Sequence, residues 1–307
     1  MKLGVGLMQN PTDAQTILSR ARLAEELGYD SLWLADHLLW PRPVEPARTC
    51  VEAWTMMTAV AAVTEKPDIG FIMLNSSFRP PALMAKMATT LDQLSRGRLI
   101  YSLGTGYYQN EYGAYGVPFL ADKDERVAYQ REVADVAKFL WTHPSPEQVD
   151  YSGKYVQVSK CRFSPAPYRQ PHPPIWFGGE SASTRALVAE LGDGWIMHGH
   201  AITPTLEAFR QEYPGFDRDL TLAAMINTCI GRTHEEAVER ARGLTLSGRE
   251  TFEDMVENSL VGTVDFCRER LAAIAEKGID VVILAVDGEE TMVTVAEEIM
   301  PTIGIQV

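Results

Sequence analysis

Side chains that can bind ligands or transfer protons follow directly after apolar runs in several parts of this 307-residue chain. Carboxylates, imidazoles, amides and hydroxyls at such positions can hold a substrate or move a proton. The carboxyl ends of parallel strands meet at one edge of a sheet, where sites are built, so we expect these residues to surround one site. In chain order they are Asp36, His37, Asn75, Ser76, Thr105, Tyr107, Tyr108, Asn110, Glu111, Gly178, Gly179, Ser181 and His198.

Two glycine motifs among them indicate ligand binding. The motif Gly178-Gly179-Glu180-Ser181 opens a predicted helix immediately after an apolar run. Unpaired N–H groups and the positive end of the helix dipole at such a place favour a phosphate. The motif Gly104-Thr105-Gly106 permits close approach of a ligand to the backbone. Each motif alone is equally compatible with a tight turn, and His37 alone with a structural histidine held by Asp36, so the argument rests on their shared location.

The elements that must position these residues are strands alternating with helices. We predict strands at residues 2–8, 31–35, 69–74, 99–103, 175–177, 195–197, 220–230 and 281–286. Helices are predicted after a cap at Asp13, between Pro80 and Gly97, and over residues 122–141. Alternation around a glycine at residues 151–158 predicts a β-hairpin.

These eight units predict one (β/α)8 TIM barrel domain covering residues 1–307, with insertions after the fourth strand and the fourth helix. The strands are continuous apolar runs, as expected when both faces of a parallel sheet are buried. A doubly wound open sheet is the alternative, but no glycine fingerprint for a dinucleotide follows the first strand.

Composition excludes several functions. The chain has 28 basic and 41 acidic residues, a net charge of −13, which disfavours nucleic acid and anionic membranes as partners. No signal peptide or membrane span is evident, and the four cysteines lie far apart, so we expect a cytoplasmic protein with free thiols. No lysine follows a strand for Schiff-base chemistry, and no histidine–carboxylate set predicts a metal site.

Longer segments resemble the bacterial luciferase-like flavin and deazaflavin oxidoreductases, a family of (β/α)8 enzymes. The resemblance spans nearly the whole chain and is carried by residues 24–37, 78–99, 104–119, 173–181 and 191–195. Residues 110–119 are most similar to the branch that uses the deazaflavin coenzyme F-420.

The resemblance implies a cofactor ring across the barrel mouth, backed by a bulge at the third strand with a non-proline cis peptide near Leu74–Asn75 or Asn75–Ser76. It implies that His37 flanks the reacting face, and it leaves the proton donor open between His37, Tyr107 and Glu111. We predict that Asp36 helps to orient the ring of His37. In sugar-phosphate dehydrogenases of the family an acid follows the glycine motif, where this chain has Tyr107. The implied substrate contacts are Trp40, Tyr108 and His198. The implied cofactor contacts are Asp36, Leu74, Asn75, Ser76, Thr105, Gly106, Asn110, Gly178, Gly179, Glu180 and Ser181.

The sequence thus predicts an oxidoreductase that passes a hydride from reduced coenzyme F-420 to a small, apolar, electron-poor substrate. The alternatives are an FMN-dependent monooxygenase of the same fold, supplied by a separate reductase, and a barrel that only binds a ligand. The resemblance implies a homodimer. We expect the acidic tail of the deazaflavin to lie near basic residues that precede the fifth strand, namely Lys154, Lys160, Arg162 and Arg169.

Overall fold

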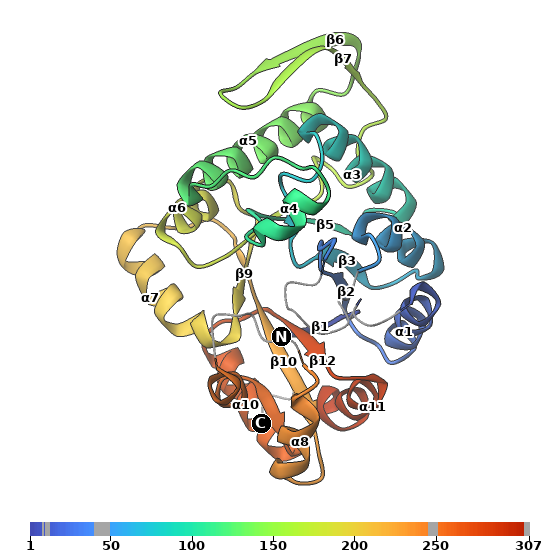
Figure 1. Cartoon of the computed structure of the whole chain (residues 1–307), viewed down its shortest axis with the longest axis vertical. Coiled ribbons are helices and arrows are strands. Elements are labelled where there is room, and N and C mark those ends of the chain that lie inside the picture. Colours follow the sequence, from blue (N-terminus) through green and yellow to red (C-terminus); the bar gives the residue numbers. More distant parts are fainter. Residues whose placement is uncertain (8, 10–12, 40–49, 245–250, 304–307) are drawn as a thin grey trace.

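A computed structural model describes the whole chain except residues 8, 10–12, 40–49, 245–250 and 304–307. Within the described residues, parallel strands close into a barrel of eight, which confirms the predicted fold class (Figure 1). β12 pairs with β1, and β10 pairs with both β9 and β12, so the sheet has no gap. The barrel strands are β1 (Lys2–Gly6), β2 (Ser31–Leu34), β3 (Asp68–Phe71), β5 (Leu99–Gly104), β8 (Ile175–Gly178), β9 (Gly194–His198), β10 (Thr221–Ile230) and β12 (Val281–Val286).

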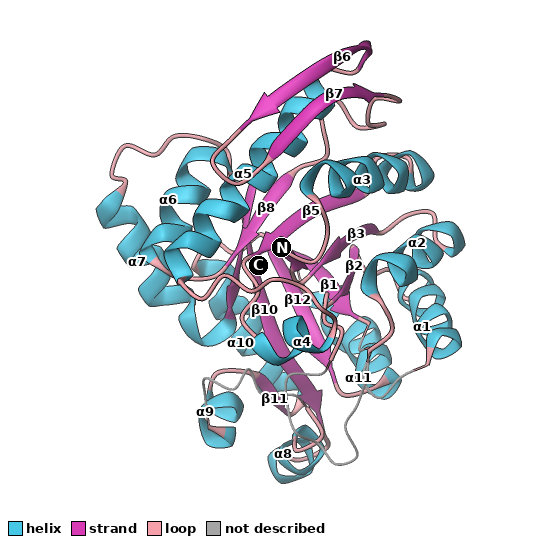
Figure 2. Cartoon of the chain, turned by 45° about the horizontal axis from the view of Figure 1, so that its top comes forward, coloured by secondary structure: helices cyan, strands magenta, loops and turns pink. Residues whose placement is uncertain are grey.

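Helices surround the barrel and bury one face each against it (Figure 2). Asp13 caps the first, as predicted, because its carboxylate accepts the N–H groups of Gln15 and Thr16. None of the described helices is both long and apolar enough to cross a lipid bilayer. The surrounding helices are α1 (Ala14–Glu26), α2 (Ala53–Val63), α3 (Pro81–Ser95), α5 (Lys123–Thr142), α6 (Ala182–Leu191), α7 (Ile202–Glu212), α8 (His234–Ala241), α10 (Val264–Glu276) and α11 (Glu289–Thr294).

Both expected insertions are present. A short helix, α4 (Gln109–Ala114), follows β5, the fourth barrel strand. The predicted hairpin, β6 (Ser145–Ser152) and β7 (Gln157–Phe163), follows α5 and lies outside the helix layer beside α3 and α5 (Figures 1 and 2). Two further short elements, α9 (Phe252–Glu257) and β11 (Leu260–Gly262), precede α10.

The third strand is interrupted where the sequence predicted one continuous run. β3 ends at Phe71, and pairing with β5 resumes only in β4 (Leu74–Asn75). The peptide between Ile72 and Met73 is cis, so the expected location of the non-proline cis bond, near Leu74–Ser76, is wrong by two to three residues. The interruption turns the Met73 side chain over Gly104 and Gly178, where an added Cβ would overlap it.

The barrel interior is filled by two tryptophans. Trp33 and Trp176 are 0% and 5% exposed, and their ring centroids lie 5.7 Å apart. Gly70 and Gly194 face these rings, because a larger residue at either position would occupy the same space. The cavity described below therefore lies on a closed floor.

We expect Gly70→Ala to destabilise the fold by roughly 1–3 kcal/mol, because overpacking a close-packed core forces its side chains off their rotamers. A Cβ built at Gly70 would lie 2.8 Å from Cε3 of Trp33. Urea unfolding measures the change, and Gly215→Ala, where nothing lies within 4 Å, is the control. Equal unfolding midpoints for the two variants would contradict this packing.

Candidate active site

A cavity of about 290 Å³ lies at the carboxyl ends of the barrel strands. It brings together most of the residues that the sequence predicted, from strands far apart in the chain. The predicted residues that line it are Asp36, His37, Asn75, Thr105, Gly106, Tyr107, Gly178, Gly179, Glu180, Ser181 and His198. Sequence reasoning missed several lining residues, among them Gln9, Met73, Lys123, Met197, His200, Met225, Asn227, Asn258 and Ser259.

Other predicted site residues lie elsewhere. Leu74 is buried in the core, and the Ser76 hydroxyl donates to the carbonyl of Gly104. Tyr108 and Asn110, at the beginning of α4, are not among the residues that line the cavity, so their roles gain no support from the geometry. Trp40 falls outside the described residues.

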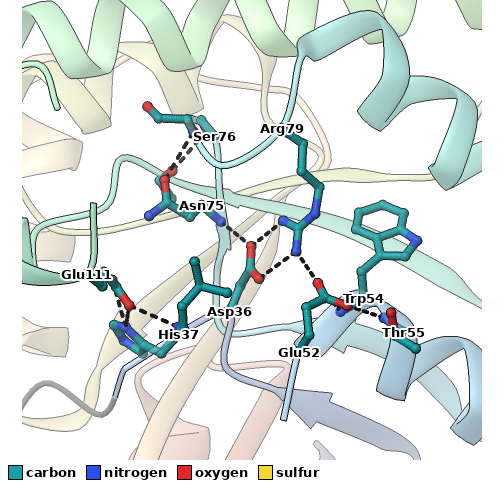
Figure 3. Close-up of polar contacts among 12 residues, drawn as sticks. Asp36, His37, Glu52, Trp54, Thr55, Asn75, Ser76, Arg79 and Glu111 are labelled. Atoms are coloured by element: carbon teal, nitrogen blue, oxygen red, sulfur yellow. Dashed lines mark hydrogen bonds and ion pairs between the residues drawn. The ribbon is translucent and has the colours of Figure 1, made fainter. Parts of the chain in front are cut away.

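His37 and Glu111 form an imidazole–carboxylate pair at the cavity wall (Figure 3). Nδ1 of His37 lies 3.1 Å from Oε1 of Glu111, whose side chain is only 1% exposed. Oε2 of Glu111 accepts the N–H of Leu38 at 3.0 Å. An ionised carboxylate only accepts hydrogen bonds, so Nδ1 is the donor and Nε2 becomes the reactive nitrogen. The ring of Tyr107 packs edge-on against His37, with centroids 5.7 Å apart.

Asp36 does not orient His37, and that expectation is wrong. Its carboxylate, fully buried, instead receives Nη1 and Nη2 of Arg79 at 2.7 and 2.9 Å and the N–H of Asn75 at 2.9 Å (Figure 3). The guanidinium also binds Glu52 at 2.5 Å and lies over the ring of Trp54. The Asp36–Arg79 pair thus joins the end of β2 to the loop after β4 and to the start of α2.

Asn75 presents its amide to the cavity. Oδ1 accepts the Tyr112 hydroxyl at 2.8 Å and the N–H of Ser77 at 3.1 Å, which places Nδ2 beside Gly106. Burial raises the pKa of Tyr112 to about 12, so its hydroxyl stays a donor near neutral pH. Gly106 has φ of +69°, and an added Cβ would overlap Asn75 and Tyr112.

The rim at the end of β8 offers an anion site. Ser181 caps α6, and its hydroxyl accepts the N–H of Thr184 at 3.2 Å. The N–H groups of Ala182 and Ser183 have no acceptor within the helix, because they lie in its first turn. Lys123, in the first turn of α5, is the one lysine or arginine among the described residues that line the cavity.

The basic residues before β8 do not gather near this rim, so the expected cluster of four is wrong. Lys154 alone of the four lies beside the start of α5, together with the acidic residues Asp122, Asp124 and Glu125. The N–H of Lys154 donates to Glu132, and Lys160 and Arg162 lie on β7 of the outer hairpin. The N–H of Arg169 donates to Asp92 beside Gly97, at the amino end of β5 and thus at the other end of the barrel. None of the four lines the cavity.

Glu180 and His198 form a second imidazole–carboxylate pair on the cavity wall. Oε1 of Glu180 accepts Nδ1 of His198 at 2.7 Å and the main-chain N–H of the same residue at 3.1 Å. The imidazole stacks on His200, with centroids 5.7 Å apart. Among the described residues, no three histidines, cysteines or carboxylates are grouped so that they could hold a metal ion.

The model of the luciferase-like monooxygenase family matches residues 1–281, so the chain belongs to this family. It is a luciferase-like oxidoreductase.

Solved structures of low sequence identity share the fold over nearly the whole chain. An F-420-dependent secondary alcohol dehydrogenase, in complex with an F-420–acetone adduct, is 21% identical with a TM-score of 0.83, covering 98% of each chain. The F-420-dependent tetrahydromethanopterin reductase of Methanopyrus kandleri is 19% identical with a TM-score of 0.79, covering 98% of this chain and 99% of that one. The oxygenating constituent of 3,6-diketocamphane monooxygenase from Pseudomonas putida, in complex with FMN, is 17% identical with a TM-score of 0.75 and 98% coverage of each chain.

We expect Arg79→Leu to lower the free energy of unfolding by roughly 3–5 kcal/mol, because it leaves the buried Asp36 carboxylate without its charged partner. The matched control is Arg131→Leu, which removes an exposed pair with Glu190 and should cost less than about 1 kcal/mol. Thermal and urea unfolding measure both variants. A loss as small as the control's in Arg79→Leu would show that the pair does not support the site.

Proposed function

We propose that this enzyme uses reduced coenzyme F-420 to transfer a hydride to a small, electron-poor organic substrate. The observation that carries the proposal is the His37–Glu111 pair. It presents an oriented imidazole to a cavity that the filled barrel interior closes from below. The bound deazaflavin would supply the hydride, and the protein would supply position, a proton and exclusion of water.

The residues present fit such a cofactor. Met73 covers Gly104 and Gly178 and gives the cavity an apolar floor on which a flat ring can lie. The Asn75 amide beside Gly106 offers a hydrogen-bond donor to a polar ring edge. The first turn of α6, with Ser181, and the ammonium group of Lys123 suit a phosphate. Gly179, with φ of +117°, allows the backbone to approach that phosphate closely.

His37 is the proton donor that this geometry supports best. A protonated imidazole beside a hydride acceptor can complete the reduction, and the Glu111 carboxylate stabilises the ring in one orientation. Glu111 itself is buried and accepts main-chain N–H groups, so we assign it a positioning role. Tyr107, half exposed against His37, is the alternative donor.

Two observations support F-420 over FMN as the cofactor. The sequence of residues 110–119 resembles the F-420-dependent branch of the family, and two enzymes of similar fold are described as F-420-dependent. Lys123 at the rim offers one positive charge to an acidic tail. The second candidate function is an FMN-dependent monooxygenase served by a separate reductase. It is favoured by the similar fold of a monooxygenase in complex with FMN.

We expect His37→Asn to lower turnover roughly 10²–10⁴-fold, because the proton donor is lost. The affinity for cofactor should stay within about twofold, since in this proposal the imidazole would contact the substrate and not the cofactor. Reoxidation of reduced F-420 by a panel of cyclic enones and ketones measures turnover, and fluorescence titration of oxidised F-420 measures affinity. His143→Asn, an exposed site at the end of α5, is the control. If turnover of His37→Asn stays within a few-fold of the parent enzyme, His37 is not the proton donor and Tyr107 takes that role.

We expect apoprotein to bind F-420 more tightly than FMN, and the affinity for both cofactors to fall as salt screens the attraction of their phosphate to Lys123. Lys123→Gln should weaken both cofactors about tenfold and leave riboflavin, which has no phosphate, unchanged. Lys277→Gln, at the exposed end of α10, is the matched control. Tighter binding of FMN than of F-420 would contradict the assignment and favour the monooxygenase.

A further inference from the structure

The Glu180–His198 pair repeats the arrangement of His37–Glu111 on another part of the cavity wall. In both pairs a carboxylate accepts from Nδ1, at 2.7 Å in the first and 3.1 Å in the second. Glu180 also accepts the main-chain N–H of His198, so the residue is held at two points. Among the described residues, the wall therefore carries two imidazoles that are each held by a carboxylate, and the reaction proposed above uses one of them.

The two imidazoles belong to opposite sides of the barrel. His37 follows β2, and His198 ends β9. Counting around the barrel from β2, the fourth strand is β9 in either direction, through β3, β5 and β8 or through β1, β12 and β10. In a barrel of eight strands these positions are diametrically opposed. A ligand that touches both must reach across the mouth.

The chemistry of the pair defines what His198 can bind. A carboxylate only accepts, so Nδ1 is the nitrogen that donates to Glu180, and Nε2 is the ring nitrogen left to accept a hydrogen bond. Among the described residues, no hydrogen bond engages Nε2, and the side chain is 27% exposed at the cavity. Nε2 is therefore suited to a ligand that donates a hydrogen bond.

The surroundings disfavour an anionic ligand group here. The Glu180 carboxylate adjoins the imidazole, and like charges repel. The nearby lining residues Asn227, Asn258 and Ser259 are neutral and polar. Lys123, the single lysine or arginine among the described lining residues, is on α5, which follows β5 and not β9. A ligand hydroxyl group, which is uncharged and can donate a hydrogen bond to Nε2 of His198, fits this part of the cavity wall.

We propose that Glu180 positions His198 to accept a hydrogen bond from a hydroxyl group of the substrate, at the end opposite the group that is reduced. The substrate class is then a hydroxylated ketone or enone. This inference rests on the proposed function, because the reduced group is placed by His37. It also assigns the Glu180 side chain to substrate positioning and leaves only its main chain for the cofactor phosphate.

The test compares two stable probes that differ by one phenolic hydroxyl, 1-tetralone and 6-hydroxy-1-tetralone. Each is titrated into the full-length enzyme loaded with oxidised F-420, so that no reaction occurs, and binding is followed by cofactor fluorescence and calorimetry. The hydroxylated probe should bind the parent enzyme about tenfold more tightly, the worth of one hydrogen bond to a held acceptor.

The variants separate positioning from general damage. His198→Phe, which keeps an aromatic ring against His200, should abolish the tenfold preference, and so should Glu180→Ala. Glu180→Gln, whose amide oxygen can accept the same two hydrogen bonds, should restore it. His143→Phe, on the exposed end of α5, should leave the preference intact.

The outcomes distinguish this inference from the proposed function. Equal affinities of the parent enzyme for the two probes, or an unchanged preference in His198→Phe, would overturn the inference. A large loss of F-420 affinity in His198→Phe would also overturn it, by making His198 a cofactor contact. Failure of the parent apoprotein to bind F-420 at all, measured before any probe is added, would instead overturn the proposed function.

Discussion

The buried ion pair between Asp36 and Arg79 is the interaction on which the site depends. Removing two charges from water costs several kcal/mol per ion, which only good geometry and further hydrogen bonds can offset. Here the guanidinium forms two parallel bonds to Asp36, and the carboxylate also accepts the N–H of Asn75. The pair thereby fixes the backbone after the interrupted third strand, and with it the Asn75 amide beside Gly106 (Figure 3).

Carboxylates in and behind this cavity wall serve mainly to orient other groups. Asp36 holds Arg79 and a main-chain N–H, Glu111 holds His37, and Glu180 holds His198. The remaining hydrogen-bonding capacity at the surface of the cavity then belongs to imidazoles, amides and helix N–H groups. An acidic chain of net charge −13 can in this way present a mouth that accepts a phosphate.

The fold could be predicted from the sequence because its signals are local. Continuous apolar runs such as residues 281–286 became strands with the same bounds, and Asp13 marked the beginning of α1. The short helix α4 was missed, since its sequence contains glycine and lacks a clear apolar period. The break at Ile72–Met73 was also missed, because an apolar run carries no mark of an interruption within it.

The location of the site could likewise be predicted, whereas the hydrogen bonds and ion pairs between its residues could not. Polar residues after apolar runs identified His37 and Asn75, because strand ends share one edge. The partner of His37 is 74 positions away in sequence, so adjacency wrongly favoured Asp36 over Glu111. Arg79 gave no signal of its own, although its buried pair organises the site. Charge counting placed four basic residues near the phosphate, but it contains no information on which face of the hairpin region they occupy.

The most direct test of the account is a crystal structure of the enzyme with oxidised coenzyme F-420. The account predicts the ring on Met73 beside Asn75 and Gly106, its C5 edge on the side of His37, and the phosphate at Ser181 and Lys123. A ring whose C5 edge faces away from His37, or a phosphate bound away from the first turn of α6, would contradict it.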